Sequence, residues 1–192
     1  MNDFAFYFRE GLLHIADWKG YDHILFVAAL CLPYLFREWK RVLIMVTAFT
    51  LGHSVTLALS VFERILVSSD WIEFLIPVTI LVTAVENLLR NPADRQHSRW
   101  RYGLALVFGL VHGLGFSNYL KSMLGKSEQI VTELLAFNLG LEAGQLLIVA
   151  LVLLSTFLFV QVMRTNRRDW LLFISGGIFS LSLVMALERI PF

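Results

Sequence analysis

The sequence predicts an all-α membrane protein, a polytopic transmembrane bundle of about six spans, and three observations predict it. Of the 192 residues, 57% are hydrophobic and 16% are charged, and the mean hydropathy of +0.69 is too high for a soluble domain of this length. Apolar runs of about 20 residues, long enough to cross a bilayer at about 1.5 Å per residue, recur between charge clusters. Basic residues gather in alternate loops.

The apolar runs follow one another with short polar loops and no linker or internal repeat, so we expect residues 1–192 to form a single domain. Residues 1–19 are weakly amphipathic and are expected to form an interfacial segment along the membrane surface. They lack a basic start followed by a clean apolar stretch, which argues against a cleavable signal peptide. The predicted spans cover about residues 20–36, 42–62, 71–89, 102–120, 130–160 and 170–187, the first being short and the fifth long enough to tilt.

The loop charges predict an orientation, because Lys and Arg are retained on the cytoplasmic side of a membrane. The first, third and fifth loops are basic, so six spans place both termini outside the cytoplasm. The protein is expected to be integral to the cytoplasmic (inner) membrane. The basic residues of these loops are Arg37, Lys40, Arg41, Arg90, Arg95, Arg99, Arg101, Arg164, Arg167 and Arg168.

The bulk charge and the cysteine content exclude other classes of partner and site. A net charge of +1, without a basic face, gives no indication of nucleic-acid binding. The single cysteine, Cys31, can build neither a disulfide framework nor a thiolate metal cage, and we expect a small buried hydrophobe. The predicted partners are the lipid bilayer and a metal ion, and the oligomeric state is not predicted.

Ionisable and polar side chains inside the spans carry the functional prediction, because a charge at the bilayer centre costs about 2.5 to 3.5 kcal/mol and needs a partner or a use. Counted at about 1.5 Å per residue, His53 and His112 lie at one level in the outer half of the bilayer. Neutral imidazoles and a carboxylate reaching one level from several helices predict a site for zinc, nickel or cobalt toward the extracytoplasmic face. The predicted ligands are His14, Asp22, His23, His53 and His112.

A second set of polar residues, Glu86, Asn138, Glu142 and Gln145, is predicted at or below this level. The last three share one helix face because they are spaced four and three apart. Two interpretations stay open, a pathway that leads the ion inward and a set of groups that orient the metal-binding histidines. Glycine pairs flank His112 in GLVHG and Glu142 in GLEAG, at a spacing that favours close helix packing and is expected to bring the two polar stripes together.

Several segments in this order resemble the HupE/UreJ family of membrane proteins: GLLHIADWKGYDHILF, FTLGHSVTLALS, AVENLL, FGLVHGLGFSNYL and FNLGLEAGQL. The resemblance extends from about Gly11 to Gln145. It implies a compact helical membrane protein associated with nickel or cobalt supply to hydrogenase and urease. By matching motifs, it implies important roles for His14, Asp22, His23, Glu86, His112 and Glu142.

Three functions fit these residues. The favoured one is a transition-metal permease or metal-handling protein with its His/Asp site in the outer half of the bilayer. The alternative is a zinc-dependent intramembrane hydrolase acting on a lipid or lipid-linked substrate, with Ser54 and Glu142 as catalytic residues. The third is a scaffold whose polar residues only pack helices. Whether the protein is an enzyme is left open.

Overall fold

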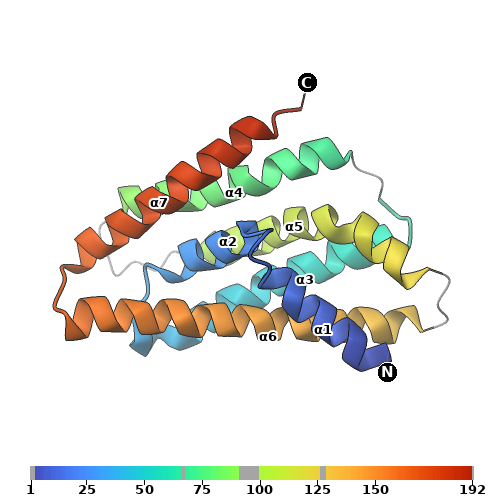
Figure 1. Cartoon of the computed structure of the whole chain (residues 1–192), viewed down its shortest axis with the longest axis horizontal. Helices are drawn as coiled ribbons and strands as arrows, with labels where there is room; N and C mark the ends of the chain where they lie inside the picture. Colours follow the sequence, from blue (N-terminus) through green and yellow to red (C-terminus); the bar gives the residue numbers. More distant parts are fainter. Residues whose placement is uncertain (1–2, 66–67, 91–99, 126–128, 192) are drawn as a thin grey trace.

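The structure, a computed structural model, describes residues 3–65, 68–90, 100–125 and 129–191, which form helices joined by short turns and loops and contain no strand (Figure 1). A 3₁₀ turn at Phe36–Glu38 precedes α3, and a π-helical turn at Phe157–Val162 extends α6. The seven α-helices are α1 (Asp3–Ile15), α2 (Asp22–Cys31), α3 (Trp39–Val61), α4 (Ser69–Leu89), α5 (Trp100–Leu124), α6 (Ile130–Thr156) and α7 (Arg167–Glu188).

Five helices, α3 to α7, are long and apolar enough to cross a membrane. They correspond to the second to sixth predicted spans, with ends that differ by a few residues. Large apolar side chains such as Leu51, Leu147 and Phe173 are exposed along these helices. This exposure is the pattern of a bundle whose outer surface contacts lipid.

The first predicted span, residues 20–36, is not a full transmembrane helix. Its helix α2 has only ten residues, a rise of about 15 Å, which is half of the hydrocarbon thickness of about 30 Å. The predicted interfacial segment contains α1, which buries Tyr7, Gly11 and Ile15 and packs mainly against α6. Figure 1 shows α1 starting at the end of the bundle where the C-terminus lies, and α2 continuing toward the other end. In place of the first predicted span, two short helices, α1 and α2, thus follow one another along the bundle.

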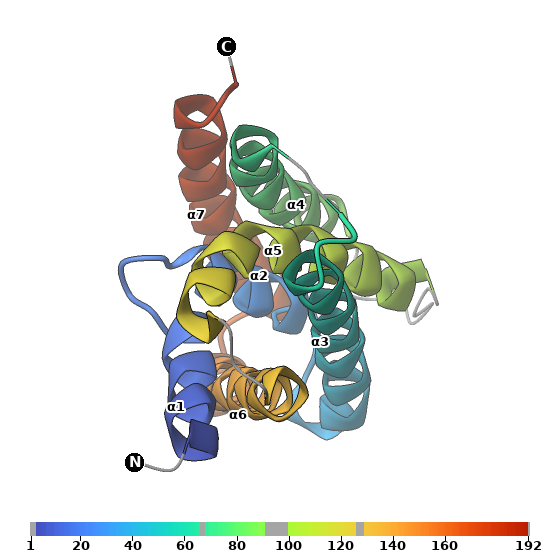
Figure 2. The ribbon, with the colours of Figure 1, turned by 90° about the vertical axis from the view of Figure 1, so that its right-hand side faces the viewer.

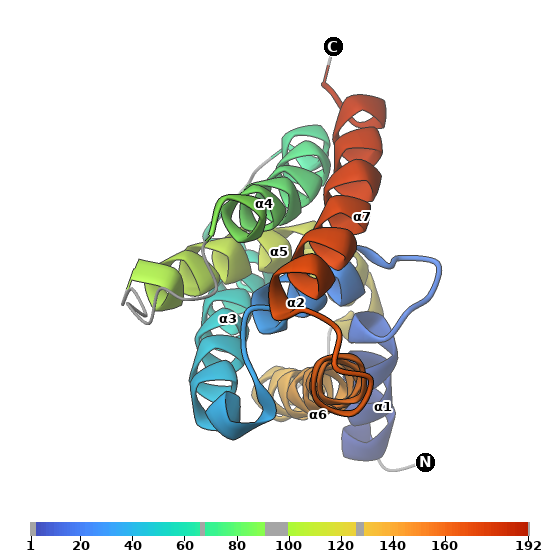
Figure 3. The same ribbon diagram turned by 90° about the vertical axis from the view of Figure 1, so that its left-hand side faces the viewer.

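Three helix pairs form the bundle, and α2 lies between them (Figures 2 and 3). The most extensive contacts join α3 to α5, α1 to α6 and α4 to α7. Glycine lets the helices approach closely in two of these pairs, α3 with α5 and α1 with α6. A Cβ atom built on Gly113 would lie 2.3 Å from the carbonyl oxygen of His53, and one on Gly11 would lie 1.9 Å from that of Phe137. Small residues at these crossings let the backbones touch.

The glycines therefore allow close helix packing, as expected, but against helices other than the expected ones. Gly109 and Gly113 of α5 face α3, whereas Gly140 and Gly144 of α6 face α1. The prediction that the GLVHG and GLEAG segments would approach each other is wrong, because each segment packs closely on a different helix.

One end of the bundle collects the loops that the sequence analysis assigned to the cytoplasm, at the left of Figure 1. Arg167 Nη2 donates to the carbonyl oxygen of Pro33 at 2.6 Å, and Arg168 Nη2 donates to that of Leu88 at 2.8 Å, which ties the loops together. Helix α1 begins and helix α7 ends toward the opposite end of the bundle (Figure 1). Of the predicted cytoplasmic loop residues, Arg95 and Arg99 lie outside the described residues.

Candidate metal site

Four of the five histidines converge from four helices: His14 from α1, His23 from α2, His53 from α3 and His112 from α5. The ring centre of His23 lies 4.6 Å from that of His14, 5.1 Å from that of His112 and 6.4 Å from that of His53. The fifth, His97, lies outside the described residues. The two glycine-mediated helix crossings and α2 thus bring together imidazoles that are up to 98 residues apart in the sequence.

Three of these imidazoles have the spacing of a metal-binding set. His14, His23 and His53 each offer one nitrogen, and the three nitrogens lie within 4.8 Å of one another. Three nitrogens bound about 2.1 Å from one ion are separated from one another by about 3.4–3.6 Å. Side-chain movements of up to about 0.7 Å each would therefore let one ion contact all three.

Buried ring nitrogens without a hydrogen-bond partner are concentrated at this point. They are Nε2 of His14, Nε2 of His23, both nitrogens of His53, and Nδ1 of His112. A buried polar atom without a partner costs about 1–3 kcal/mol. Five such atoms in one cluster are unfavourable as plain helix packing, whereas a divalent cation would accept the lone pair of one nitrogen in each ring.

Asp22 holds His23 in one tautomer. Its Oδ1 lies 3.1 Å from Nδ1 of His23 and also accepts the backbone N–H of His23 at 2.9 Å. A carboxylate accepts and does not donate, so Nδ1 carries the proton and Nε2 has a free lone pair. A carboxylate behind a histidine in this way orients the ring and raises its basicity toward a metal.

Thr79 of α4 does the same for His112. The Thr79 hydroxyl donates its proton to the carbonyl oxygen of Ile76 at 2.7 Å, and its oxygen lies 2.9 Å from Nε2 of His112. Nε2 must therefore be the donor of this bond, which leaves the lone pair on Nδ1. Sequence reasoning missed Thr79. The available signal was the spacing of Thr79, Thr83 and Asn87, four residues apart on one helix face.

Aromatic rings surround the imidazoles. The ring of Phe116 lies 3.8 Å from that of His14, and the rings of Phe26 and Phe49 lie 5.0 and 5.2 Å from that of His112. His53 and His112 are both fully buried. Such walls exclude water and strengthen the attraction between a cation and its ligands.

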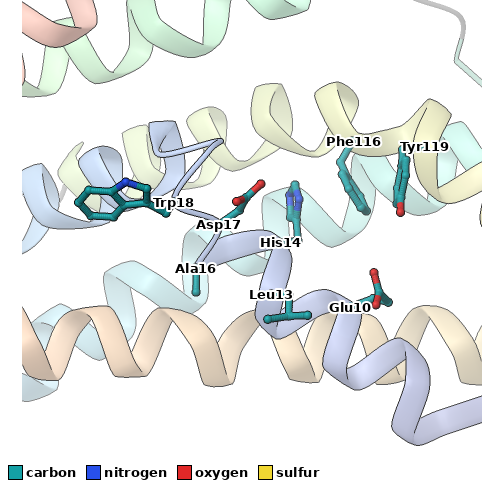
Figure 4. A pocket seen from close by; sticks show the side chains of 8 residues that line it. All are labelled: Glu10, Leu13, His14, Ala16, Asp17, Trp18, Phe116 and Tyr119. Carbon is teal, nitrogen blue, oxygen red and sulfur yellow. The ribbon is translucent and has the colours of Figure 1, made fainter.

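A cavity of about 550 Å³ is lined by His14 and lies between α1, the segment that follows it, and α5. Figure 4 shows His14 directed from α1 toward α5, with Asp17 and Trp18 on one side and Glu10 on the other. Trp18 is 84% exposed, so this cavity opens widely to the surroundings of the bundle.

The deeper polar residues form a ladder between α3 and α6. Ser54 Oγ lies 2.7 Å from Oδ1 of Asn138, and Thr50 Oγ1 donates to Oε1 of Gln145 at 2.6 Å. Thr47 continues it, because its hydroxyl donates to Glu142 Oε1 at 3.1 Å. Ser54 and Glu142, the residues named for hydrolysis, thus bond to different partners in the ladder.

Glu86 lies at the arginine-rich end, in an ion pair with a buried arginine. Arg101 Nη2 is 3.0 Å from Oε2 of Glu86 and 3.1 Å from Oδ1 of Asn87. Arg101, placed in a loop by the sequence analysis, is 3% exposed and belongs to α5. Asn87 also donates to the carbonyl oxygen of Ala29 at 2.7 Å, which fixes the end of α2.

A family model described as HupE / UreJ protein matches residues 1–189, nearly the whole chain. No curated protein matches, and no solved structure matches.

Proposed function

Since the chain belongs to the HupE/UreJ family, we propose that this integral membrane protein is a permease for a divalent transition metal, with nickel or cobalt as cargo. The observation that carries the proposal is the cluster of four imidazoles with five buried, unpartnered nitrogens. Imidazole is a good ligand for nickel, cobalt and zinc, and the affinity of a nitrogen site alone does not select among them.

In this proposal His14, His23, His53 and His112 bind the ion. Asp22 is the carboxylate of the site and orients His23 through the contact between Oδ1 and Nδ1. The site lies in the half of the bilayer away from the arginine-rich end, which is the extracytoplasmic half if that end faces the cytoplasm.

The ladder between α3 and α6 provides the path inward. His53 lies between Thr50 and Ser54 in the sequence, so the ladder begins beside one of the ligands. Asn138, Gln145 and Glu142 then offer oxygen atoms at the next positions, and Nε2 of Gln145 is buried without a partner. Glu86, paired with Arg101, stands at the inner end.

Uptake of radioactive nickel and cobalt by cells that express the protein tests the proposal. Uptake by the wild-type protein, lost in His23→Ala and in His112→Ala, is the expected result. Ser175→Ala, which changes a fully buried serine on α7, serves as the control for an altered core. Failure of the wild-type protein to increase uptake of either ion, at normal levels in the membrane, would reject transport.

A further inference from the structure

A second, smaller cavity of about 260 Å³ adjoins the imidazoles and has an acidic rim. Asp17 and Glu73 on this rim are exposed, whereas His23 and His112 are buried. The cavity thus leads from the surroundings of the bundle to the candidate ligands. It is lined by the end of α1 with the linker that follows it, the start of α2, parts of α4 and α5, and Arg189 just after α7.

The floor of this cavity points to a cation as the occupant. His23 is 6% exposed and His112 is fully buried. Nε2 of His23 and Nδ1 of His112 have no hydrogen-bond partner. These are the two nitrogens that Asp22 and Thr79 leave with a free lone pair. Their lone pairs attract a positive ion.

The charges of the lining fit a divalent ion. Asp17, Asp22 and Glu73 contribute three negative charges and Arg189 contributes one positive charge, which leaves two negative charges when the imidazoles are neutral. Arg189 Nη1 lies 3.6 Å from Oδ2 of Asp22. Within the described chain Glu73 has no ion-pair partner. The backbone carbonyl of Glu73 also lacks its usual helical hydrogen bond, because Pro77, four residues later, has no N–H.

The size of the cavity fits an ion that still carries its water. Six water molecules at about 30 Å³ each occupy about 180 Å³, which is less than the volume of the cavity. The imidazole cluster, whose three nitrogens lie within 4.8 Å of one another, has room only for the bare ion. The two sites therefore suit two states of hydration.

We propose that this cavity is a capture chamber, in which Asp17 and Glu73 attract a hydrated divalent metal ion before the imidazoles replace its water. This inference rests on the proposed function, because the captured ion passes on to the histidines. Asp17 and Glu73 act on the rate of entry through their charge, and they are not ligands of the ion in its final position.

Stopped-flow binding of Co²⁺ to the purified full-length protein, followed by cobalt absorption, tests the chamber. Glu73→Gln is expected to slow association about two- to tenfold, the effect of one charge at close range in water. Glu73→Lys is expected to slow it further. The number of ions bound at equilibrium stays that of the wild-type protein.

Asp70 provides the matched control, because it is an exposed carboxylate on the same helix, one turn earlier, that does not line the chamber. Asp70→Asn and Asp70→Lys are measured at an ionic strength of about 0.15 M, where salt weakens the interaction between exposed charges. They are expected to leave the association rate within about twofold of wild type.

The outcomes separate the two proposals. Equal association rates in the Glu73 and Asp70 variants would overturn the chamber while leaving the histidine site in place. Loss of bound ions at equilibrium in Glu73→Gln would show that Glu73 is a ligand, which also overturns it. Failure of the wild-type protein to bind Co²⁺ or Ni²⁺ at all would reject the metal site itself.

Discussion

Oδ1 of Asp22 and Nδ1 of His23 lie 3.1 Å apart, and both side chains are buried at the start of α2. Because this contact fixes the tautomer that leaves Nε2 free, Asp22→Asn is expected to weaken metal binding about 10- to 100-fold while the number of bound ions stays the same. Equilibrium titration with Ni²⁺ measures the change. Asp169→Asn, an exposed carboxylate in the first turn of α7, should bind like wild type. An unchanged affinity in Asp22→Asn would contradict the orienting role.

Thr79→Val removes the hydroxyl oxygen that accepts from Nε2 of His112 while keeping the shape of the side chain. His112 can then carry its proton on Nδ1, so metal affinity is expected to fall about tenfold, the lower limit for loss of such a partner. The matched control is Thr83→Val, because the Thr83 hydroxyl is buried one turn away and bonds the carbonyl oxygen of Thr79. Equal losses in the two variants would indicate a general packing effect.

The close helix crossings predict opposite outcomes for two kinds of glycine. Gly113→Ala would place a methyl group 2.3 Å from the carbonyl oxygen of His53, and overpacking of this kind costs about 1–3 kcal/mol. Gly176 has open space around its Cβ position, so Gly176→Ala should preserve or raise the thermal unfolding temperature in detergent. A Gly113→Ala variant as stable as wild type would show that α3 and α5 can separate freely.

The ion pair between Arg101 and Glu86 predicts a non-additive pair of substitutions. Glu86→Gln leaves a buried guanidinium without its counter-charge, which costs about 3–5 kcal/mol for a buried pair. Arg101→Met removes the buried charge itself. The double variant is therefore expected to lose less unfolding free energy than the two single variants lose together. Unfolding in a denaturant series measures all three variants. Additive losses would mean that the two residues act independently.

Metal binding is expected to weaken as the pH falls and to strengthen as it rises, because an imidazole binds a metal only in its neutral form. Binding near pH 7 releases any proton that the free imidazoles carry, and that release can be measured by calorimetry in buffers of different ionisation enthalpy. The His53→Asn variant, which has one imidazole fewer in the cluster, should show a shallower dependence on pH. Affinity independent of pH between about 5 and 8 would contradict ligation by histidine.

The long helices could be predicted because hydrophobic length reports directly on the thickness of the bilayer. The replacement of the first predicted span by two short helices could not. Ile15 and Asp22 bound a linker whose polar residues, Asp17 and Lys19, lie in a stretch too short for a hydropathy average to separate from its apolar flanks. The same average assigned α2 a full span, although its helix ends at Cys31 before Pro33.

The sequence could predict the depth of His53 and His112 in the membrane, but not which helix faces these histidines share with the others. Counting residues placed His53 and His112 at one level, and only the helix packing shows which faces meet. Arg101 was counted as a loop charge because charge alone does not reveal a buried partner such as Glu86. Thr79 was missed because threonines in an apolar helix commonly bond only the backbone of their own helix, as Thr83 does.

The shortness of α2 also bears on how the protein is assembled in the membrane. A ten-residue helix rises about 15 Å and cannot by itself be held across the bilayer as a stable inserted segment. Its position depends on the longer helices that enclose it, and it carries Asp22 and His23. We therefore expect His23 to reach the other imidazoles only after α3, α5 and α6 have entered the membrane.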